Sequence, residues 1–256
     1  MRNVNNLLFT FSLIVLTLSC EKSKTEKMSE LENNIKLLKN YRYKPNDNFN
    51  SIQISEKTAN SIVDLINNEN GDIKNIKTLE LNSEIKNKVK IYSFGFDSGG
   101  TGGFISYPII QWFNNKKTNA YNLSKIINFK FDKIIDLKNN LYLLIGYNSG
   151  SNYQSIAYVL EITESKINIE YKAFVNRPFL IFRKGEFIYN EKNKVLSFVL
   201  DKDAYGGLND VFYSNEYGKF KNDTLSALKL KSMIEEEYYK NSKFNLTFNG
   251  KKFISI

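Results

Sequence analysis

The sequence predicts a mainly β fold: an antiparallel β-meander, as a curled sheet, a sandwich or a propeller-like array, with two or three short helices placed mostly near the N-terminus. Two observations predict it. From about residue 75 onward, apolar residues alternate with polar ones at a period of two, which is typical of half-buried strands. Short polar breaks with the composition of hairpin turns separate these runs, at 138–140, 163–165, 184–185 and 249–250.

Two helices are expected near the N-terminus, where apolar residues recur every three or four positions. The apolar stripe of the first comprises Met28, Leu31, Ile35 and Leu38. The second helix would begin at Ser55 as its N-cap and stop at the Asn-Gly pair 70–71. A capping-box pattern at Ser232 predicts a third short helix over 232–239.

The strand region contains a loose internal repeat. Six runs have a β-rich composition: 89–96, 141–147, 155–162, 166–171, 195–200 and 252–256. Three glycine-containing loops, at 97–103, 148–152 and 202–207, start 51 and 54 residues apart. Four strands in about 50 residues is the size of a propeller blade, but a closed propeller needs at least about four blades. We therefore favour one long meander that curls or folds into a sandwich.

Composition excludes several chemistries. The chain has 256 residues, a net charge of +9, no histidine and one cysteine, Cys20. Without histidine there is no Ser-His-Asp catalysis and no histidine-ligated metal, and without a second cysteine there is no intrachain disulfide. The positive charge is mostly lysine spread along the chain, without the arginine clusters that nucleic-acid binders use, so we expect no nucleic-acid partner.

The N-terminal segment is a short apolar run that ends at Cys20. Its apolar core, Leu7 to Leu18, is too short to span a bilayer and has the length of a signal-peptide core. The sequence Leu16-Thr17-Leu18-Ser19-Cys20 resembles the lipobox of bacterial lipoproteins. The resemblance implies cleavage before Cys20 and acylation of that residue, which anchors the protein to a membrane. No aspartate follows Cys20, which favours the outer membrane, with the domain facing the periplasm or the cell surface.

These features divide the chain into three parts. Residues 1–19 are the expected lipoprotein signal peptide, 20–45 a polar tether with a short helix, and 46–256 the β-rich domain. Beyond the signal region, the chain resembles no named family.

Four residues beside the glycine loops are candidates for ligand binding: Asp97, Trp112, Tyr153 and Asp203. Aromatic side chains near flexible loops suit a saccharide or a peptide, and loops on rigid sheets often carry function. The 97–103 loop continues into a strand rather than a helix, so it is not a phosphate-binding P-loop. The partial calcium pattern from Asp201 lacks its closing glutamate, so we expect no metal site and no cofactor.

We therefore expect a non-catalytic role for an envelope lipoprotein that binds a saccharide, a peptide or a protein. One alternative is a glycan-active enzyme that uses only carboxylates, drawn from Asp97, Asp203 and Asp210, because two suitably spaced acids can hydrolyse a glycosidic bond. Another is an immunity or inhibitor lipoprotein that neutralises an exported toxin.

Overall fold

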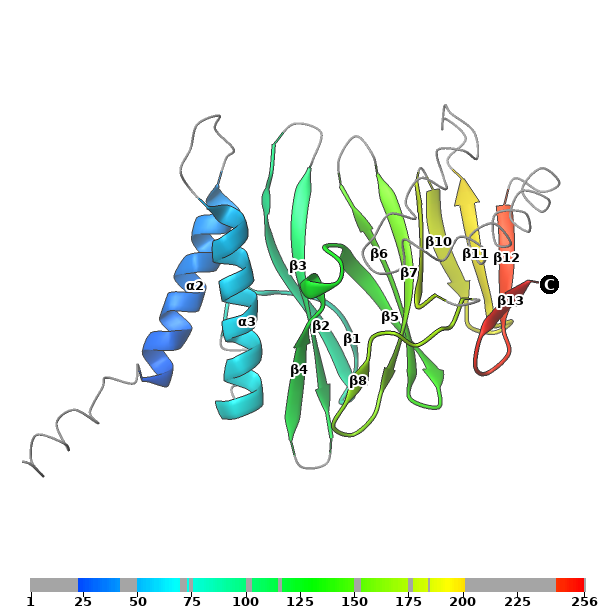
Figure 1. Cartoon of the computed structure of the whole chain (residues 1–256), viewed down its shortest axis with the longest axis horizontal. Helices are drawn as coiled ribbons and strands as arrows, with labels where there is room; N and C mark the ends of the chain where they lie inside the picture. The colour runs from blue at the N-terminus through cyan, green and yellow to red at the C-terminus, as the bar shows by residue number, and fades with distance from the viewer. Residues whose placement is uncertain are drawn as a thin grey trace, which may run out of the picture.

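The computed structural model confirms the predicted fold class. In the part of the chain that the structure describes, two helices and three antiparallel sheets lie side by side in a row, with the helices at one end of the row (Figure 1). The structure describes residues 23–41, 50–69, 73, 76–99, 103–114, 117–149, 153–174, 177–183, 185–200 and 243–255. Cys20, Asp203, the 202–207 loop and the helix expected over 232–239 lie outside the described residues.

The first described helix, α2 (Lys24–Asn40), carries the predicted apolar stripe, of which Leu31, Ile35 and Leu38 are buried. Its start is set by Ser23, whose hydroxyl oxygen accepts a hydrogen bond from the Glu26 amide at 3.3 Å, while the Glu26 carboxylate accepts one from the Ser23 amide at 2.8 Å. The helix therefore begins within the segment expected to be a polar tether, and only 21–22 separate its N-cap from Cys20.

The second helix, α3 (Ser51–Glu69), begins four residues before the expected N-cap. The Asn50 side chain accepts a hydrogen bond from the Gln53 amide at 3.0 Å and so caps the first turn. Ser55 is instead buried inside the helix, which corrects its predicted role. Further along α3, Asn67 bonds both the amide and the carbonyl of Ala120, at 2.8 and 3.1 Å, and so covers the open edge of the first sheet.

The strands form three meanders that follow chain order. Sheet 1 contains β1 (Glu80–Ile85), β2 (Val89–Asp97), β3 (Phe104–Phe113) and β4 (Thr118–Asn122), followed by the short 3-10 helix η3 (Leu123–Lys125). Sheet 2 contains β5 (Lys130–Lys138), β6 (Leu141–Asn148), β7 (Gln154–Ile162), β8 (Ile167–Asn168) and β9 (Phe179–Arg183), which also pairs with β7. Sheet 3 contains β10 (Gly185–Asn190), β11 (Val195–Leu200), β12 (Lys243–Phe248) and β13 (Phe253–Ser255).

The internal repeat is present in these sheets. In each sheet, the amide of the last residue of the third strand of the repeat donates to a carbonyl in the turn between the first two strands. The three pairs are Phe113 to Lys88 at 2.9 Å, Ile162 to Asn140 at 2.8 Å, and Phe248 to Lys194 at 2.8 Å. In the described residues the meander is therefore divided into three similar sheets, which is closer to the propeller-like arrangement than to the one long meander, curled or folded into a sandwich, that we favoured.

Three hydrophobic cores hold the row together, because each inner strand alternates its side chains between two neighbouring layers. Ile62 and Tyr107 lie in the core between the helices and sheet 1. Ile91 and Tyr158 lie in the core between sheets 1 and 2, whereas Phe198 belongs to the core between sheets 2 and 3. Among the described residues, no helix is both long and apolar enough to cross a membrane.

Two local predictions need correction. The break at 184–185 is not a hairpin turn, because β9 pairs with β7 while β10 pairs with β11, so the chain passes there from sheet 2 to sheet 3. The strand expected over 166–171 is shortened to β8, after which the Asn168 side chain accepts a hydrogen bond from the Glu170 amide at 3.1 Å. The other predicted turns, at 138–140, 163–165 and 249–250, do join paired strands.

Candidate ligand-binding surface at the loop end of the sheets

The direction of the strands places the connections at two opposite ends of the molecule (Figure 1). The turn end consists of the hairpin turns 86–88, 114–117, 138–140, 163–166, 191–194 and 249–252. The loop end consists of the 98–103 loop after β2, the 149–153 loop after β6, and the end of β11 at Leu200. The first two glycine loops of the predicted repeat therefore leave their sheets at the same end, and β11, the strand that precedes the third in the sequence, ends there too.

The first loop is closed at its base by its own hydrogen bonds. Ser98 donates to the Gly103 carbonyl from both its amide, at 2.9 Å, and its hydroxyl, at 2.8 Å. The Asp97 carboxylate accepts from the Gly99 amide at 3.0 Å. Gly99 and Gly103 have φ angles of 75° and 64°, a region that glycine occupies at low cost. These contacts hold the exposed Asp97 carboxylate at the rim of sheet 1.

The second loop is closed in a similar way and is joined to the first. The Asn148 side chain accepts from the Gln154 amide at 2.8 Å and donates to the Gln154 side-chain oxygen at 3.0 Å. The Ser149 hydroxyl accepts a hydrogen bond from the Phe104 amide at 2.9 Å. Since Phe104 begins β3 in sheet 1 and Ser149 follows β6 in sheet 2, this bond ties the two loops together.

Exposed aromatic side chains stand beside the joined loops. Phe104 is 39% exposed and Tyr153 is 38% exposed, although both are large apolar groups. Tyr153 lies against Tyr147, with ring centroids 6.1 Å apart and planes inclined by 31°. The Phe104 ring lies over Gly95, where a Cβ atom would be 2.8 Å from the ring. The loop end thus presents two exposed aromatic rings and a carboxylate beside the hydrogen bond that joins sheets 1 and 2.

The structure brings together two of the residues that the sequence nominated. Asp97 and Tyr153 lie on the two neighbouring loops. Trp112 does not join them: it is 4% exposed, belongs to the core between sheets 1 and 2, and pairs with Val89 near the turn end. Trp112 is eight positions along β3 from Phe104, a distance of about 26 Å. Trp112 is therefore a core residue in this structure, as an aromatic side chain in a buried strand commonly is.

Sequence reasoning missed Phe104, Tyr147 and Ser149. A closer alignment of the repeat would have indicated the last two, because the segments 95–99 and 146–150 share the pattern Gly-aromatic-Asp/Asn-Ser-Gly. Phe104 has no such signal, because its exposure depends on the contact between two sheets.

The chemistry of this surface suits binding. It offers aromatic faces, a carboxylate, and the hydroxyl and amide groups of Ser149 and Asn148, the combination that orients a ligand in a shallow site. Among the described residues, no group of three or more His, Cys, Asp or Glu side chains could hold a metal ion. Asp203 and Asp210, which the enzymatic alternative would combine with Asp97, lie outside the described residues.

No protein-family model matches the chain, no curated protein matches it, and no solved structure matches it. What the protein binds is therefore inferred from its own residues.

Proposed function

We propose that the protein is a non-catalytic binding protein of the bacterial cell envelope, anchored to the outer membrane by acyl chains on Cys20, whose loop end binds a saccharide. One observation carries the binding role: Phe104 and Tyr153 are exposed beside two loops that are hydrogen-bonded to each other. Exposed aromatic side chains on an ordered scaffold lose little conformational entropy when a ligand covers them.

A saccharide suits this surface because it has both apolar and polar faces. Its C–H faces can stack on the rings of Phe104 and Tyr153, while its hydroxyl groups reach Asp97 and the polar groups of the second loop. Stacking on the rings would bury apolar surface of the saccharide, and hydrogen bonds to the polar groups would fix its orientation.

The anchor is supported by the lipobox-like sequence and by the place where α2 begins. Ser23, the N-cap of α2, follows Cys20 by three residues, which span at most about 10 Å. The first turn of α2 lies toward the turn end, whereas Tyr41, just after its last turn, packs against Phe96 near the loop end, with ring centroids 6.0 Å apart (Figure 1). Acylation of Cys20 would therefore hold the turn end near the membrane and point the loop end away from it.

The binding role is tested by screening the native chain against a glycan array that includes peptidoglycan fragments, and then measuring affinities by calorimetry. Phe104→Ala and Tyr153→Ala are each expected to weaken binding by about tenfold, the upper range for one aromatic contact. Phe113→Ala is the matched control, because Phe113 is 37% exposed but lies at the turn end.

Two results would contradict the proposal. If no saccharide binds, or if Phe113→Ala weakens binding as much as Phe104→Ala, the loop end is not a saccharide site. If a peptide or a protein binds instead, and the Phe104 and Tyr153 variants abolish that binding, the loop end is the binding site but its ligand is not a saccharide.

The anchor is tested separately by growing cells with radiolabelled palmitate. The native chain should carry the label and Cys20→Ser should not, because one thiol and one new amine provide the acylation sites. Release of the unlabelled native chain into aqueous buffer would rule out the anchor.

A further inference from the structure

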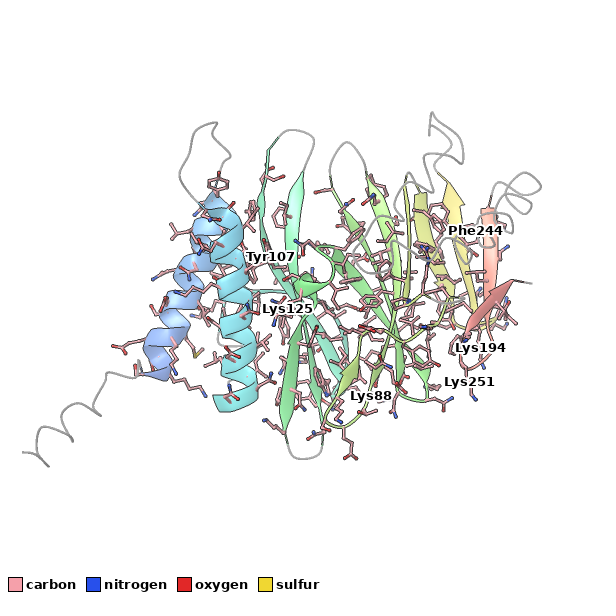
Figure 2. All side chains as sticks on the ribbon, in the orientation of Figure 1. Lys88, Tyr107, Lys125, Lys194, Phe244 and Lys251 are labelled. Atoms are coloured by element: carbon pink, nitrogen blue, oxygen red, sulfur yellow. The ribbon has the colours of Figure 1, made fainter. Side chains whose placement is uncertain are left out.

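The turn end is strongly basic. Each of its six hairpin turns carries an exposed lysine: Lys86, Lys117, Lys138, Lys166, Lys192 and Lys251. Counting only residues that the structure describes, three of the turns carry a second lysine, and the turn end holds nine lysines against two glutamates, Glu164 and Glu191. Figure 2 shows Lys88, Lys194 and Lys251 toward this end, below the strands to which they connect.

The basic end arises from the repeat. Every second chain reversal in a meander falls at the same end of its sheet, and the three sheets stand in the same orientation. The six lysines named above follow one another at intervals of 21 residues (117 to 138) to 59 residues (192 to 251), and the fold gathers them on one surface. The described residues of the two opposite loops, 98–99, 103, 149 and 153, contain no lysine.

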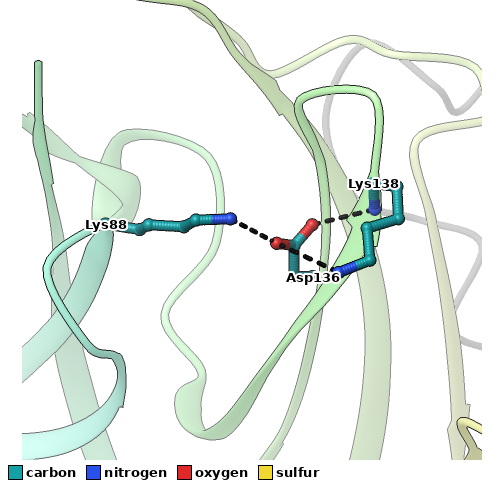
Figure 3. Close-up of polar contacts among 3 residues, drawn as sticks. All are labelled: Lys88, Asp136 and Lys138. Atoms are coloured by element: carbon teal, nitrogen blue, oxygen red, sulfur yellow. Dashed lines mark hydrogen bonds and ion pairs between the residues drawn. The ribbon is translucent and has the colours of Figure 1, made fainter.

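One acidic side chain neutralises part of this charge. The Asp136 carboxylate accepts hydrogen bonds from the Lys88 ammonium at 2.8 Å and from the Lys138 amide at 2.8 Å, and it lies 3.9 Å from the Lys138 ammonium (Figure 3). This cluster joins the first turn of sheet 1 to the first turn of sheet 2. Among the described residues, no ion pair involves Lys86, Lys192 or Lys251.

We propose that the turn end binds the anionic headgroup surface of a phospholipid bilayer. Lysine side chains are flexible point charges, which suit the diffuse charge of a fluid membrane better than the fixed phosphate geometry that arginine forks recognise. Phe113 adds an exposed aromatic ring at the rim of the same end, with the Lys90 ammonium 5.7 Å from its centroid. A basic surface with an apolar side chain at its edge is typical of an interfacial contact.

The orientation that follows rests on the proposed anchor, whereas the lipid contact does not. With Cys20 three residues before Ser23, the acyl chains and the turn end would contact the same leaflet. The lysines would then prevent the domain from tumbling about its short tether and keep the loop end exposed to the surrounding medium.

Vesicle sedimentation of the full-length Cys20→Ser chain tests the lipid contact without any contribution from acyl groups. The vesicles contain either equal parts of phosphatidylglycerol and phosphatidylcholine or phosphatidylcholine alone, so that any partition driven by the N-terminal apolar run appears in both. We expect a strong preference for the anionic vesicles at low salt and its loss at about 0.5 M NaCl, where the Debye length is only a few ångströms.

A triple variant and a matched control locate the contact. Each lysine that reaches an anionic surface contributes about fivefold to partition, so three glutamine substitutions at the turn end should lower partition by on the order of a hundredfold. The test variant is Lys86→Gln, Lys192→Gln and Lys251→Gln combined. The control removes the same charge elsewhere, by combining Lys39→Gln, Lys57→Gln and Lys243→Gln, all exposed positions away from the turns.

The outcomes separate the two proposals. Equal partition into both vesicle types, equal losses in the two triple variants, or equally tight turn-end binding of a DNA duplex at the same salt would each overturn the lipid contact. If any of these three results is found while the native chain takes up palmitate, the proposed anchor stands and the proposed lipid contact is refuted. If anionic vesicles bind the Cys20→Ser chain as expected while the native chain takes up no palmitate, the lipid contact stands and the anchor fails.

Discussion

Replacing Gly95 by alanine tests the packing that supports the loop end. Gly95 lies in β2 opposite Ser106 of β3. A Cβ atom there would be 2.0 Å from the Ile105 carbonyl oxygen and 2.8 Å from the Phe104 ring. Real Cβ atoms essentially never approach another heavy atom within 3.0 Å, and the first obstacle is backbone, so β3 would have to move by about 1 Å.

The expected cost is about 3 kcal/mol, because overpacking in a well-packed region costs about 1–3 kcal/mol and a backbone obstacle lies at the upper end of that range. Urea unfolding followed by circular dichroism measures it. With a slope of about 2–3 kcal/mol per molar urea, the midpoint for Gly95→Ala should fall by about 1 M.

Ser106→Ala is the control from the same strand pair. The Ser106 hydroxyl is buried without a hydrogen-bond partner, so its removal should change the free energy of unfolding by less than about 0.5 kcal/mol. If Gly95→Ala unfolds within about 0.2 M of the native midpoint, the close contact between β2 and β3 described for this site is incorrect.

Three further changes probe other contacts. Partial burial opposes ionisation of Asp136, but the hydrogen bond from Lys88 and the neighbouring lysine charges lower the pKa of Asp136 below its ordinary value. The ionised side chain therefore stabilises the fold above about pH 4, and this stabilisation is lost as the pH falls through the lower pKa of the folded state. Asp136→Asn should flatten the acid limb of a curve of unfolding free energy against pH, and an unchanged limb would refute this. The Tyr158 hydroxyl donates a hydrogen bond to the Ile169 carbonyl at 2.7 Å, and burial raises the pKa of the Tyr158 phenol. Tyr158→Phe should therefore lower the free energy of unfolding in urea by about 1 kcal/mol. An unchanged free energy would mean that this hydrogen bond contributes nothing to stability. Asn67→Ala removes both side-chain bonds to the edge of β4 and should speed amide exchange in that strand, with no change expected if solvent replaces them fully.

Local patterns predicted the elements well where one signal dominated. The stripe of Leu31, Ile35 and Leu38 indicated the first helix, and a β-rich composition over 141–147 indicated β6 to within one residue of its observed end at Asn148. The start of α3 was less predictable, because Asn50 and Ser55 are both good N-caps and only the packing of the helix against sheet 1 decides between them.

Non-local pairing was harder to predict. The break before Gly185 has the composition of a hairpin turn, yet β9 and β10 pair with strands of different sheets. Likewise, Trp112 and Tyr153 both stand near glycine loops or strand ends in the sequence, but only the three-dimensional arrangement buries the first and exposes the second. Composition could not decide these cases, because each depends on which layer covers which face.

The positions of the two ends explain why the lysines are spread along the sequence yet lie together in the folded protein. A meander alternates its reversals between one end and the other, so residues that are interleaved along the chain are separated in space by the length of a strand, about 30 Å for the nine residues of β2. Lysine-bearing turns and glycine loops with aromatic neighbours therefore form two distinct surfaces. Since charges at that separation are screened from each other in physiological salt, each surface can bind its own partner without opposing the other.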